Sequence, residues 1–227
     1  MSWFWALLRL VLAPLVQLCW RPRVLGLENV PTAGPALLAS NHQSVADHFL
    51  TALPLRRQVF FVAKDQYVTG GGLRGLLGRL FFTALGIVPI DRSGGRAAEA
   101  ALATGRRILG EGKLLGIYPE GTRAPDARLY RGKTGVARLA LGARVPVVPV
   151  AVSGTLSILP EGSRLPRFGI RPTLRFGEPL DFSRYYDRAG EQAVRREVTD
   201  EVMRAIRELS GQEYVDSYAA AAKESAG

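Results

Sequence analysis

Cysteine and histidine are scarce in this chain of 227 residues, which has one cysteine, Cys19, and two histidines, His42 and His48. A single cysteine excludes an internal disulfide and a cluster of cysteine metal ligands. Two histidines add little, so we expect no metal site. Histidine is the usual general base at neutral pH, because its ordinary pKa of ~6.5 lies near that pH. Any histidine-based catalysis is therefore confined to residues 42–48.

Acidic residues are also few. The chain has 20 Asp and Glu against 30 Lys and Arg, of which only four are lysine, and its net charge is +10. Such a surplus predicts an anionic partner: a phosphate-bearing lipid, a membrane surface or a nucleic acid. A general preference for arginine over lysine explains the ratio of these residues but not the net charge. The arginines form no basic stripe with interleaved aromatic residues, so we expect no nucleic-acid partner.

The sequence has no long uncharged apolar run. Its most apolar segment, residues 3–20, contains all three tryptophans but is interrupted by Arg9 and Pro14. As a helix it would be ~25 Å long, short of the ~30 Å hydrocarbon core of a bilayer. We predict a helix that lies in or dips into one leaflet, with Arg21 and Arg23 at anionic headgroups. A true span, and burial within the protein or at a dimer interface, are the alternatives.

After residue 20, β-rich apolar runs alternate with helical runs, which predicts an α/β fold with a largely parallel central sheet flanked by helices. With no repeat and no linker, residues 21–227 are predicted to form one domain after the membrane-associating helix at 1–20, with 219–227 as a frayed tail. The expected strands are Pro35–Ser40, Val59–Ala63, Gly86–Ile90, Leu114–Tyr118, Val147–Val152 and Thr173–Phe176. The expected helices are Ser44–Leu53, Leu73–Leu85, Arg96–Leu109, Gly135–Leu141 and Glu191–Leu209.

Three polar sequences follow expected strands: Asn41-His42, Asp91-Arg92 and Glu120-Gly121-Thr122-Arg123. Ligands of open α/β sheets bind beyond the carboxyl ends of the strands, so these sequences could converge on one edge. A guanidinium group at Arg92 or Arg123 suits phosphate oxygens. Ordinary turns and surface arginines remain the alternative interpretation. Lys64 and Lys133 are weaker phosphate candidates.

Residues 41–47, Asn-His-Gln-Ser-Val-Ala-Asp, admit two interpretations. In the first, Ser44 caps a helix and Asp47, three residues on, supplies a carboxylate at its start, close to a capping box. In the second, Asp47 also orients the ring of His42, which acts as a general base. The second requires His42 to precede the helix, because five residues within one helix place side chains about 140° apart. Residue types alone do not decide between them.

Four stretches resemble, in order and spacing, the motifs of the PlsC-like glycerolipid acyltransferases. Asn41-His42, four residues and then Asp47 resemble the N-H-x4-D motif. Residues 118–123 resemble the third motif, usually Phe-Pro-Glu-Gly-Thr-Arg, while residues 86–92 and 145–150 resemble the second and fourth. The resemblance covers most of the chain after its N-terminal helix. The departures are Tyr118 in place of Phe and Ala124 where Ser is often found, and both could affect the choice of acceptor.

The resemblance implies transfer of a fatty acyl group from acyl-coenzyme A or acyl carrier protein to the sn-2 hydroxyl of 1-acylglycerol 3-phosphate, forming phosphatidic acid. No cofactor besides the acyl donor is implied, and the location would be the cytoplasmic face of the cell membrane. His42 would be the general base and Asp47 its orienting partner. The sequence has no Gly-x-Ser-x-Gly elbow, so direct attack on the thioester is preferred over an acyl-enzyme. The residues implied to bind the acceptor and its phosphate are Arg92, Glu120, Gly121, Thr122 and Arg123.

The fourth motif has an apolar role in this interpretation. Val147, Val148 and Pro149 are predicted to shape the acyl-chain pocket, with a plain core strand as the equal alternative. The acceptor stays open, since relatives also acylate glycerol 3-phosphate, lyso-ornithine lipids and lyso-glycolipids. A non-catalytic lipid-binding protein on the same fold is the competing function, and the presence of His42 and Asp47 disfavours it.

Overall fold

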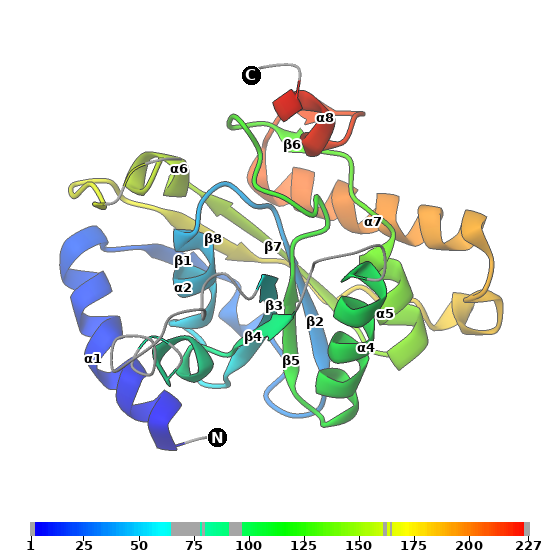
Figure 1. Cartoon of the computed structure of the whole chain (residues 1–227), viewed down its shortest axis with the longest axis horizontal. Helices are drawn as coiled ribbons and strands as arrows, with labels where there is room; N and C mark the ends of the chain where they lie inside the picture. Colours follow the sequence, from blue (N-terminus) through cyan, green and yellow to red (C-terminus); the bar gives the residue numbers. More distant parts are fainter. Residues whose placement is uncertain are drawn as a thin grey trace.

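A computed structural model describes residues 3–64, 78, 80–90, 97–160, 163 and 165–224. Its centre is a seven-stranded sheet with the strand order β1-β8-β7-β2-β5-β3-β4 (Figure 1). These strands are β1 (Arg23–Leu25), β2 (Ala36–Ser40), β3 (Val59–Lys64), β4 (Ile87–Ile90), β5 (Leu114–Ile117), β7 (Val147–Ser153) and β8 (Thr173–Phe176). A small second sheet pairs β6 (Leu129–Tyr130) with β9 (Tyr214–Val215).

The five strands from β7 to β4 run parallel, whereas β8 is antiparallel to β7, and β1 is parallel to β8. Strands covered on both faces need apolar residues at successive positions, and all five residues of β2 are buried. The prediction of an α/β fold with a largely parallel sheet is confirmed. The carboxyl ends of β2, β3, β4 and β5 consequently lie along one edge.

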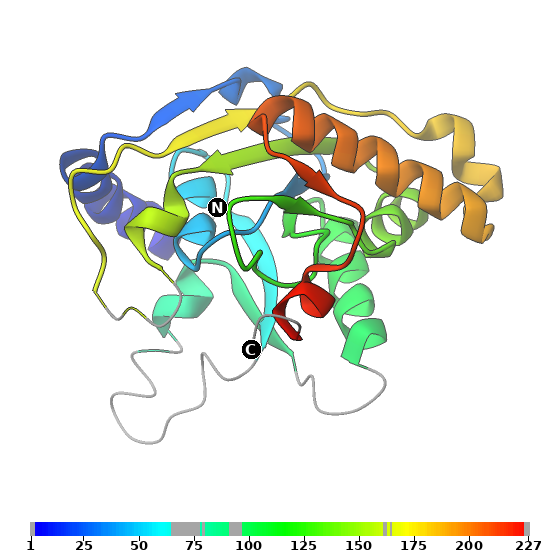
Figure 2. The same ribbon diagram turned by 90° about the horizontal axis from the view of Figure 1, so that it is seen from above.

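Helices cover both faces of the sheet (Figures 1 and 2). Successive residues of a strand point to opposite faces, so Leu37 and Ala39 pack in one core cluster while Ala36 and Leu38 pack in the other. The first cluster lies under α4 (Ala97–Gly110), α5 (Gly135–Ala143) and α7 (Gln192–Ser210), and the second under α1 (Trp3–Trp20) and α2 (Ala46–Ala52). Further helices in the described part of the chain are α6 (Thr155–Ile158), α8 (Ala219–Glu224) and the 3-10 helices Leu27–Asn29 and Ser183–Arg188, and residues 80–84 are also helical.

Helix α1 lies against the protein along one side only. Trp5 is fully buried in the second core cluster, and the partly buried residues Leu8, Leu12 and Val16 follow it at helical spacing. The opposite side exposes apolar residues, which are Leu7, Leu10, Val11, Leu15 and Leu18. Among the described residues, no helix combines the length and apolarity needed to cross a bilayer. Burial within the protein therefore accounts for half of this helix.

Two local predictions differ from the structure. Helix α2 begins at Ala46 with Val45 at its N-cap, two residues later than expected. Ser44 still makes the contacts of a capping box, because its Oγ accepts the N–H of Ala46 at 3.3 Å and its own N–H donates to Asp47; its hydroxyl donates to the carbonyl oxygen of Leu159. Residues from Ala219 form α8 instead of a frayed tail, because Ala219 is buried in a small apolar cluster. The helix expected over Leu73–Leu85 falls largely outside the described residues.

Candidate active site

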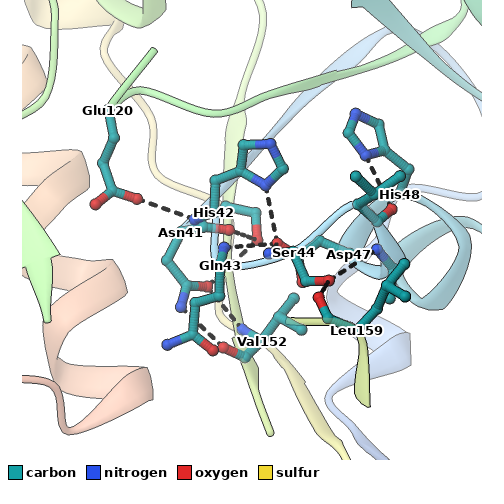
Figure 3. Close-up of polar contacts among 12 residues, drawn as sticks. Asn41, His42, Gln43, Ser44, Asp47, His48, Glu120, Val152 and Leu159 are labelled. Atoms are coloured by element: carbon teal, nitrogen blue, oxygen red, sulfur yellow. Dashed lines mark hydrogen bonds and ion pairs between the residues drawn. The ribbon is translucent and has the colours of Figure 1, made fainter. Parts of the chain in front are cut away.

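The end of β2 and the start of α2 bring His42 and Asp47 together. Nδ1 of His42 lies 2.9 Å from Oδ2 of Asp47 (Figure 3). The strand ends at Ser40 and the helix begins at Ala46, so His42 stands before the helix and Asp47 in its first turn, as the catalytic interpretation requires. A carboxylate only accepts, so the hydrogen on the His42 ring resides on Nδ1 and leaves a lone pair on Nε2. This arrangement suits a general base.

Asp47 is fixed from several directions. Its Oδ2 also accepts the backbone N–H groups of Gln43 at 2.7 Å and Ser44 at 2.8 Å, and its side chain is fully buried (Figure 3). Three donors on one oxygen hold the carboxylate in the orientation that meets the His42 ring. The helix-start role and the catalytic role of Asp47 are therefore compatible. Its carboxylate stabilises the loop that carries the base.

Asn41 ties this loop to the neighbouring strand, a role that sequence reasoning missed. Its amide nitrogen donates to the carbonyl oxygen of Val152, and its amide oxygen accepts the N–H of Val152, both at 2.8 Å. The same nitrogen donates to Gln212. An asparagine can replace a missing strand partner in this way because it carries both a donor and an acceptor. Its position just past a buried strand was the available signal.

An aromatic cluster surrounds the His42 ring. Tyr118 stacks on it with ring centroids 3.9 Å apart, and His48 lies edge-on at 5.4 Å. His48 also contacts the rings of Phe61 and Tyr118. Burial, followed by the charge of His42, lowers the pKa of His48 to about 4. His48 is consequently neutral at pH 7 and serves as packing around the candidate base.

Glu120, predicted to bind the acceptor, points into the protein. It is 1% exposed, and its two oxygens accept the backbone N–H groups of His42 and Tyr130, each at 2.9 Å. Burial is the largest cause that raises its pKa, to about 7. The turn after β5 points this side chain into the protein, because Gly121 turns the chain with a φ of 77°. Glu120 therefore supports the backbone of the candidate base, and it is not part of the described lining of the open space beside His42.

The neighbouring residues of that turn reach the open space beside His42. Gly121, Thr122, Arg123 and Lys133 all line it. Lys133 extends beside Gly121, where an added Cβ would lie only 3.0 Å from the lysine Cδ. These positions keep Arg123 and Lys133 as candidates for binding a phosphate. The predicted contribution of Arg92 and the side chain of Lys64 lie outside the described residues.

This open space is a cleft of about 690 Å³ that runs across the carboxyl edge of the sheet. His42 and His48 line it from the strand ends. Its apolar walls come from both faces of the sheet: Val45, Phe49, Phe61 and Phe82 on the α2 side, and Val62, Leu102, Leu115, Val136 and Leu139 on the α4 side. Long apolar chains of a substrate fit such walls.

Val147, Val148 and Pro149 are not part of the described lining of the cleft. They lie in the first half of β7, beside Leu37 to Ala39 of β2, and are buried between the helical layers. The core-strand interpretation accounts for this position, and other residues make the apolar walls. Among the described residues, no group of three or more His, Cys, Asp and Glu side chains is arranged to hold a metal ion.

Comparison with known proteins adds an independent line of support. A family model described as Acyltransferase matches residues 21–153. The 1-acyl-sn-glycerol-3-phosphate acyltransferase of Arabidopsis chloroplasts is 36% identical over 139 residues, covering 61% of this chain and 37% of that protein. The human 1-acyl-sn-glycerol-3-phosphate acyltransferase beta is 36% identical over 124 residues, covering 53% of this chain and 42% of that protein. The chain thus spans about two fifths of these curated relatives.

A solved structure matches more of the chain. The 1-acyl-sn-glycerophosphate acyltransferase PlsC from Thermotoga maritima superposes with a TM-score of 0.62 at 28% sequence identity. The match covers 83% of this chain and 73% of that protein. It extends beyond the segment that the family model matches.

Proposed function

This chain belongs to the acyltransferase family, and from that premise we propose that it acylates the sn-2 hydroxyl of 1-acylglycerol 3-phosphate to form phosphatidic acid. Several of its relatives carry this activity in their names. The observation that carries the proposal is the contact of His42 Nδ1 with Asp47 Oδ2 inside a cleft whose walls are apolar and whose rim holds Arg123 and Lys133.

In the proposed reaction, Nε2 of His42 removes the hydroxyl proton of the acceptor while the oxygen attacks the thioester carbonyl carbon. The tetrahedral intermediate then breaks its carbon–sulfur bond, and the imidazolium returns the proton to the departing thiolate. Asp47 stabilises the imidazolium between these steps. The described lining of the cleft contains no serine or cysteine, which favours direct transfer over an acyl-enzyme.

The acceptor and donor each carry a long acyl chain, and the apolar walls on the two faces of the sheet provide room for both. Arg123, with Lys133 and the predicted Arg92, would neutralise the acceptor phosphate. The hydroxyl of Thr122 and the backbone beside Gly121 would add hydrogen bonds. Glu120 would act indirectly, because its oxygens are occupied by backbone amides.

A membrane surface supplies such an acceptor, and we propose that the protein contacts the membrane through α1. Leu10 and Leu18 are 71% and 72% exposed on the free side of this helix. The loop that contains Phe168 packs against the end of this helix. Phe168 is 65% exposed and stacks on Trp20 with ring centroids 5.4 Å apart. Neither residues 1–27 nor residues 163–177 contain an acidic residue. An apolar surface with surrounding arginines suits an anionic leaflet, here the cytoplasmic face of the cell membrane.

The test is release of free thiol from oleoyl-coenzyme A by the purified protein with 1-acylglycerol 3-phosphate in mixed micelles. Glycerol 3-phosphate, a lyso-ornithine lipid and a lyso-glycolipid complete the panel of acceptors. We expect release with 1-acylglycerol 3-phosphate and formation of phosphatidic acid. Release only with another member of the panel would move the proposal to that acceptor. No release with any of them would leave a lipid-binding protein without this chemistry.

A further inference from the structure

A second hollow, of about 680 Å³, opens beside the cleft and shares Lys133 and Thr134 with it. We call it the basic hollow. Its walls come from three parts of the chain: the segment between β6 and α5, the first turns of α7, and the residue before α8. The polar side chains that line it are Arg131, Lys133, Thr134, Gln192, Arg196 and Tyr218.

The charge of this hollow is positive, since none of its lining residues is acidic. Arg196 is already bound, because its guanidinium donates to Asp200 and to the carbonyl oxygen of Gly132. Lys133 forms no ion pair with any described residue. Arg131 forms an ion pair, at 3.4 Å, with the carboxylate of Asp216, whose side chain is 74% exposed. Such surface pairs stabilise little and can be exchanged for a stronger anionic partner.

Backbone groups add to this charge. Helix α5 begins at Gly135 after Thr134, and α7 begins at Gln192, so both helices start at the hollow. In neither helix does a side chain accept the first N–H groups, and neither first turn holds an acidic residue. The N-cap residue of α7 is Glu191, whose carboxylate is paired with Arg188. The first N–H groups of both helices and the positive ends of their dipoles therefore favour an anion there, in addition to the cationic side chains.

Tyr218 gives the hollow a flat apolar wall. The guanidinium of Arg131 lies over its ring, 5.8 Å from the centroid. A purine ring can occupy the space beside such a tyrosine, where it would stack while the arginine binds an attached phosphate. Cations, free amides and an aromatic ring together match a phosphorylated nucleotide, and the volume is in the usual range for small-molecule sites.

We propose that the basic hollow binds the phosphorylated adenosine end of coenzyme A. The pantetheine arm then passes Lys133 and Thr134, which line both spaces, and carries the thioester to His42. This inference rests on the proposed acyl transfer and refines it, because it selects an acyl-coenzyme A over an acyl carrier protein as the donor. It also separates two phosphate sites: Arg123 for the acceptor and Arg131 for the donor.

Binding without turnover tests the hollow independently of the reaction. Isothermal titration would compare coenzyme A, adenosine 3′,5′-bisphosphate and pantetheine on the full chain. We expect the first two to bind and pantetheine to bind at least about tenfold more weakly. Arg131→Ala should weaken the binding of coenzyme A by about tenfold through loss of a charge-assisted contact, and Tyr218→Leu should also weaken this binding. Arg107→Ala, an exposed arginine of α4 paired with Glu111, is the matched control and should change nothing.

Equal affinity for coenzyme A and pantetheine, no binding of either nucleotide, or equal losses in Arg131→Ala and Arg107→Ala would overturn the inference. Displacement of coenzyme A by a glycerophosphate with unchanged binding in Arg131→Ala would also overturn it, and would place the phosphate at the acceptor site. Kinetics separate the two proposals. If palmitoyl-pantetheine has the same KM as palmitoyl-coenzyme A, the acyl-transfer proposal is supported and the proposal of a coenzyme A site in the basic hollow is contradicted. If coenzyme A binding depends on Arg131 but no acceptor is acylated, the proposed coenzyme A site is supported and the proposed acylation is contradicted.

Discussion

The backbone N–H of His42 donates to the side-chain carboxylate of Glu120 at 2.9 Å, so the candidate base is held through its main chain by the turn after a neighbouring strand. The other oxygen of Glu120 holds Tyr130 in the same way. The carbonyl oxygen of His42 accepts the N–H of Ala124 at 2.7 Å. The loop that carries His42 and the loop that carries Arg123 are therefore one hydrogen-bonded unit.

Replacement of Glu120 by glutamine should weaken this unit. Glutamine presents an NH2 group to one of the two backbone donors, which leaves that amide unsatisfied. We expect a loss of about 1–3 kcal/mol in the free energy of unfolding. Because the backbone of His42 shifts, kcat should fall more than KM rises. Urea denaturation and thiol release measure the two effects, with the exposed Glu28→Gln as control. An unchanged stability of Glu120→Gln would remove the proposed support.

Glu120 and His48 should give opposite pH dependences of stability. The folded pKa of Glu120 is raised to about 7 from 4.5, so its contribution favours folding at low pH and is lost as pH rises through about 7. The folded pKa of His48 is lowered to about 4 from 6.5, so stability is lost as pH falls from about 6.5. Each contribution is at most about 3.5 kcal/mol, since the folded and ordinary pKa values lie about 2.5 pH units apart and one pH unit corresponds to ~1.4 kcal/mol.

The two slopes overlap between pH 4.5 and 6.5 and should largely cancel in the natural protein. Single variants separate them. His48→Phe should become less stable as pH rises through this window, whereas Glu120→Gln should become more stable. The midpoints of urea denaturation of both variants, measured at four pH values in this window, test these opposite trends. Parallel curves for the two variants would contradict the assigned burial of both groups.

The two histidines should differ sharply in catalysis. His42→Ala removes the proposed base, and we expect kcat to fall by at least about 100-fold with the fold retained. His48→Phe keeps a ring in the aromatic cluster and should leave most of the activity. Asp47→Asn should resemble His42→Ala, because it disturbs the Nδ1 hydrogen bond. Circular dichroism checks folding, and thiol release measures turnover. Comparable losses in the two histidine variants would undo the assignment of His42.

Tyr118→Phe should stabilise the protein. The Tyr118 hydroxyl is buried and has no hydrogen-bond partner in the described part of the chain, and burial raises its pKa well above the ordinary range. Phenylalanine keeps the ring that stacks on His42 while it removes the desolvated hydroxyl. We expect a gain of about 1 kcal/mol and nearly unchanged turnover. A loss of activity in thermally stable Tyr118→Phe would assign the hydroxyl a part in the reaction.

The free side of α1 should control membrane binding. Leu10→Asp combined with Leu18→Asp places two charges on that side without touching the buried Trp5, so the protein should fold and leave anionic vesicles. Ala100→Asp, on an exposed position of α4, adds a charge elsewhere and is the control. Cosedimentation with phosphatidylglycerol vesicles measures the difference. Undiminished sedimentation of the double variant would move the membrane contact to another surface.

The sequence was sufficient for six strands of the central sheet but not for the short strands β1, β6 and β9. The meeting of His42 with Asp47 was one of two interpretations of the residues, and the resemblance to the family motif favoured it. Runs such as Ala36–Ser40 are apolar at successive positions because both faces of the sheet are covered, and this pattern is local. The dyad was recognisable because its two members lie five residues apart, across one strand end and one helix start. Local patterns of this kind are readable without tertiary information.

The direction of Glu120 was not readable in this way. A carboxylate between Pro119 and Gly121 could point to solvent or inward, and its inward direction depends on Tyr130, ten residues later, and on His42 in the loop after another strand. The same holds for Val147 and Val148, whose apolar character fits a pocket wall and a core strand equally well. Only the position of β7 within the sheet separates these cases.

Helix α1 has an exposed apolar side, which we propose faces lipid, and a buried side that belongs to the core. Trp5 is buried against the sheet, and Nε of Arg9 donates to the carbonyl oxygen of Leu53, six residues after Asp47 at the end of the same helix. Removal of residues 1–20 would therefore expose the core instead of giving a water-soluble enzyme. If lipid binds α1 as proposed, a tilt of this helix would also pull on the chain that positions the proposed catalytic carboxylate of Asp47. We therefore expect turnover, as well as location, to depend on the composition of the membrane.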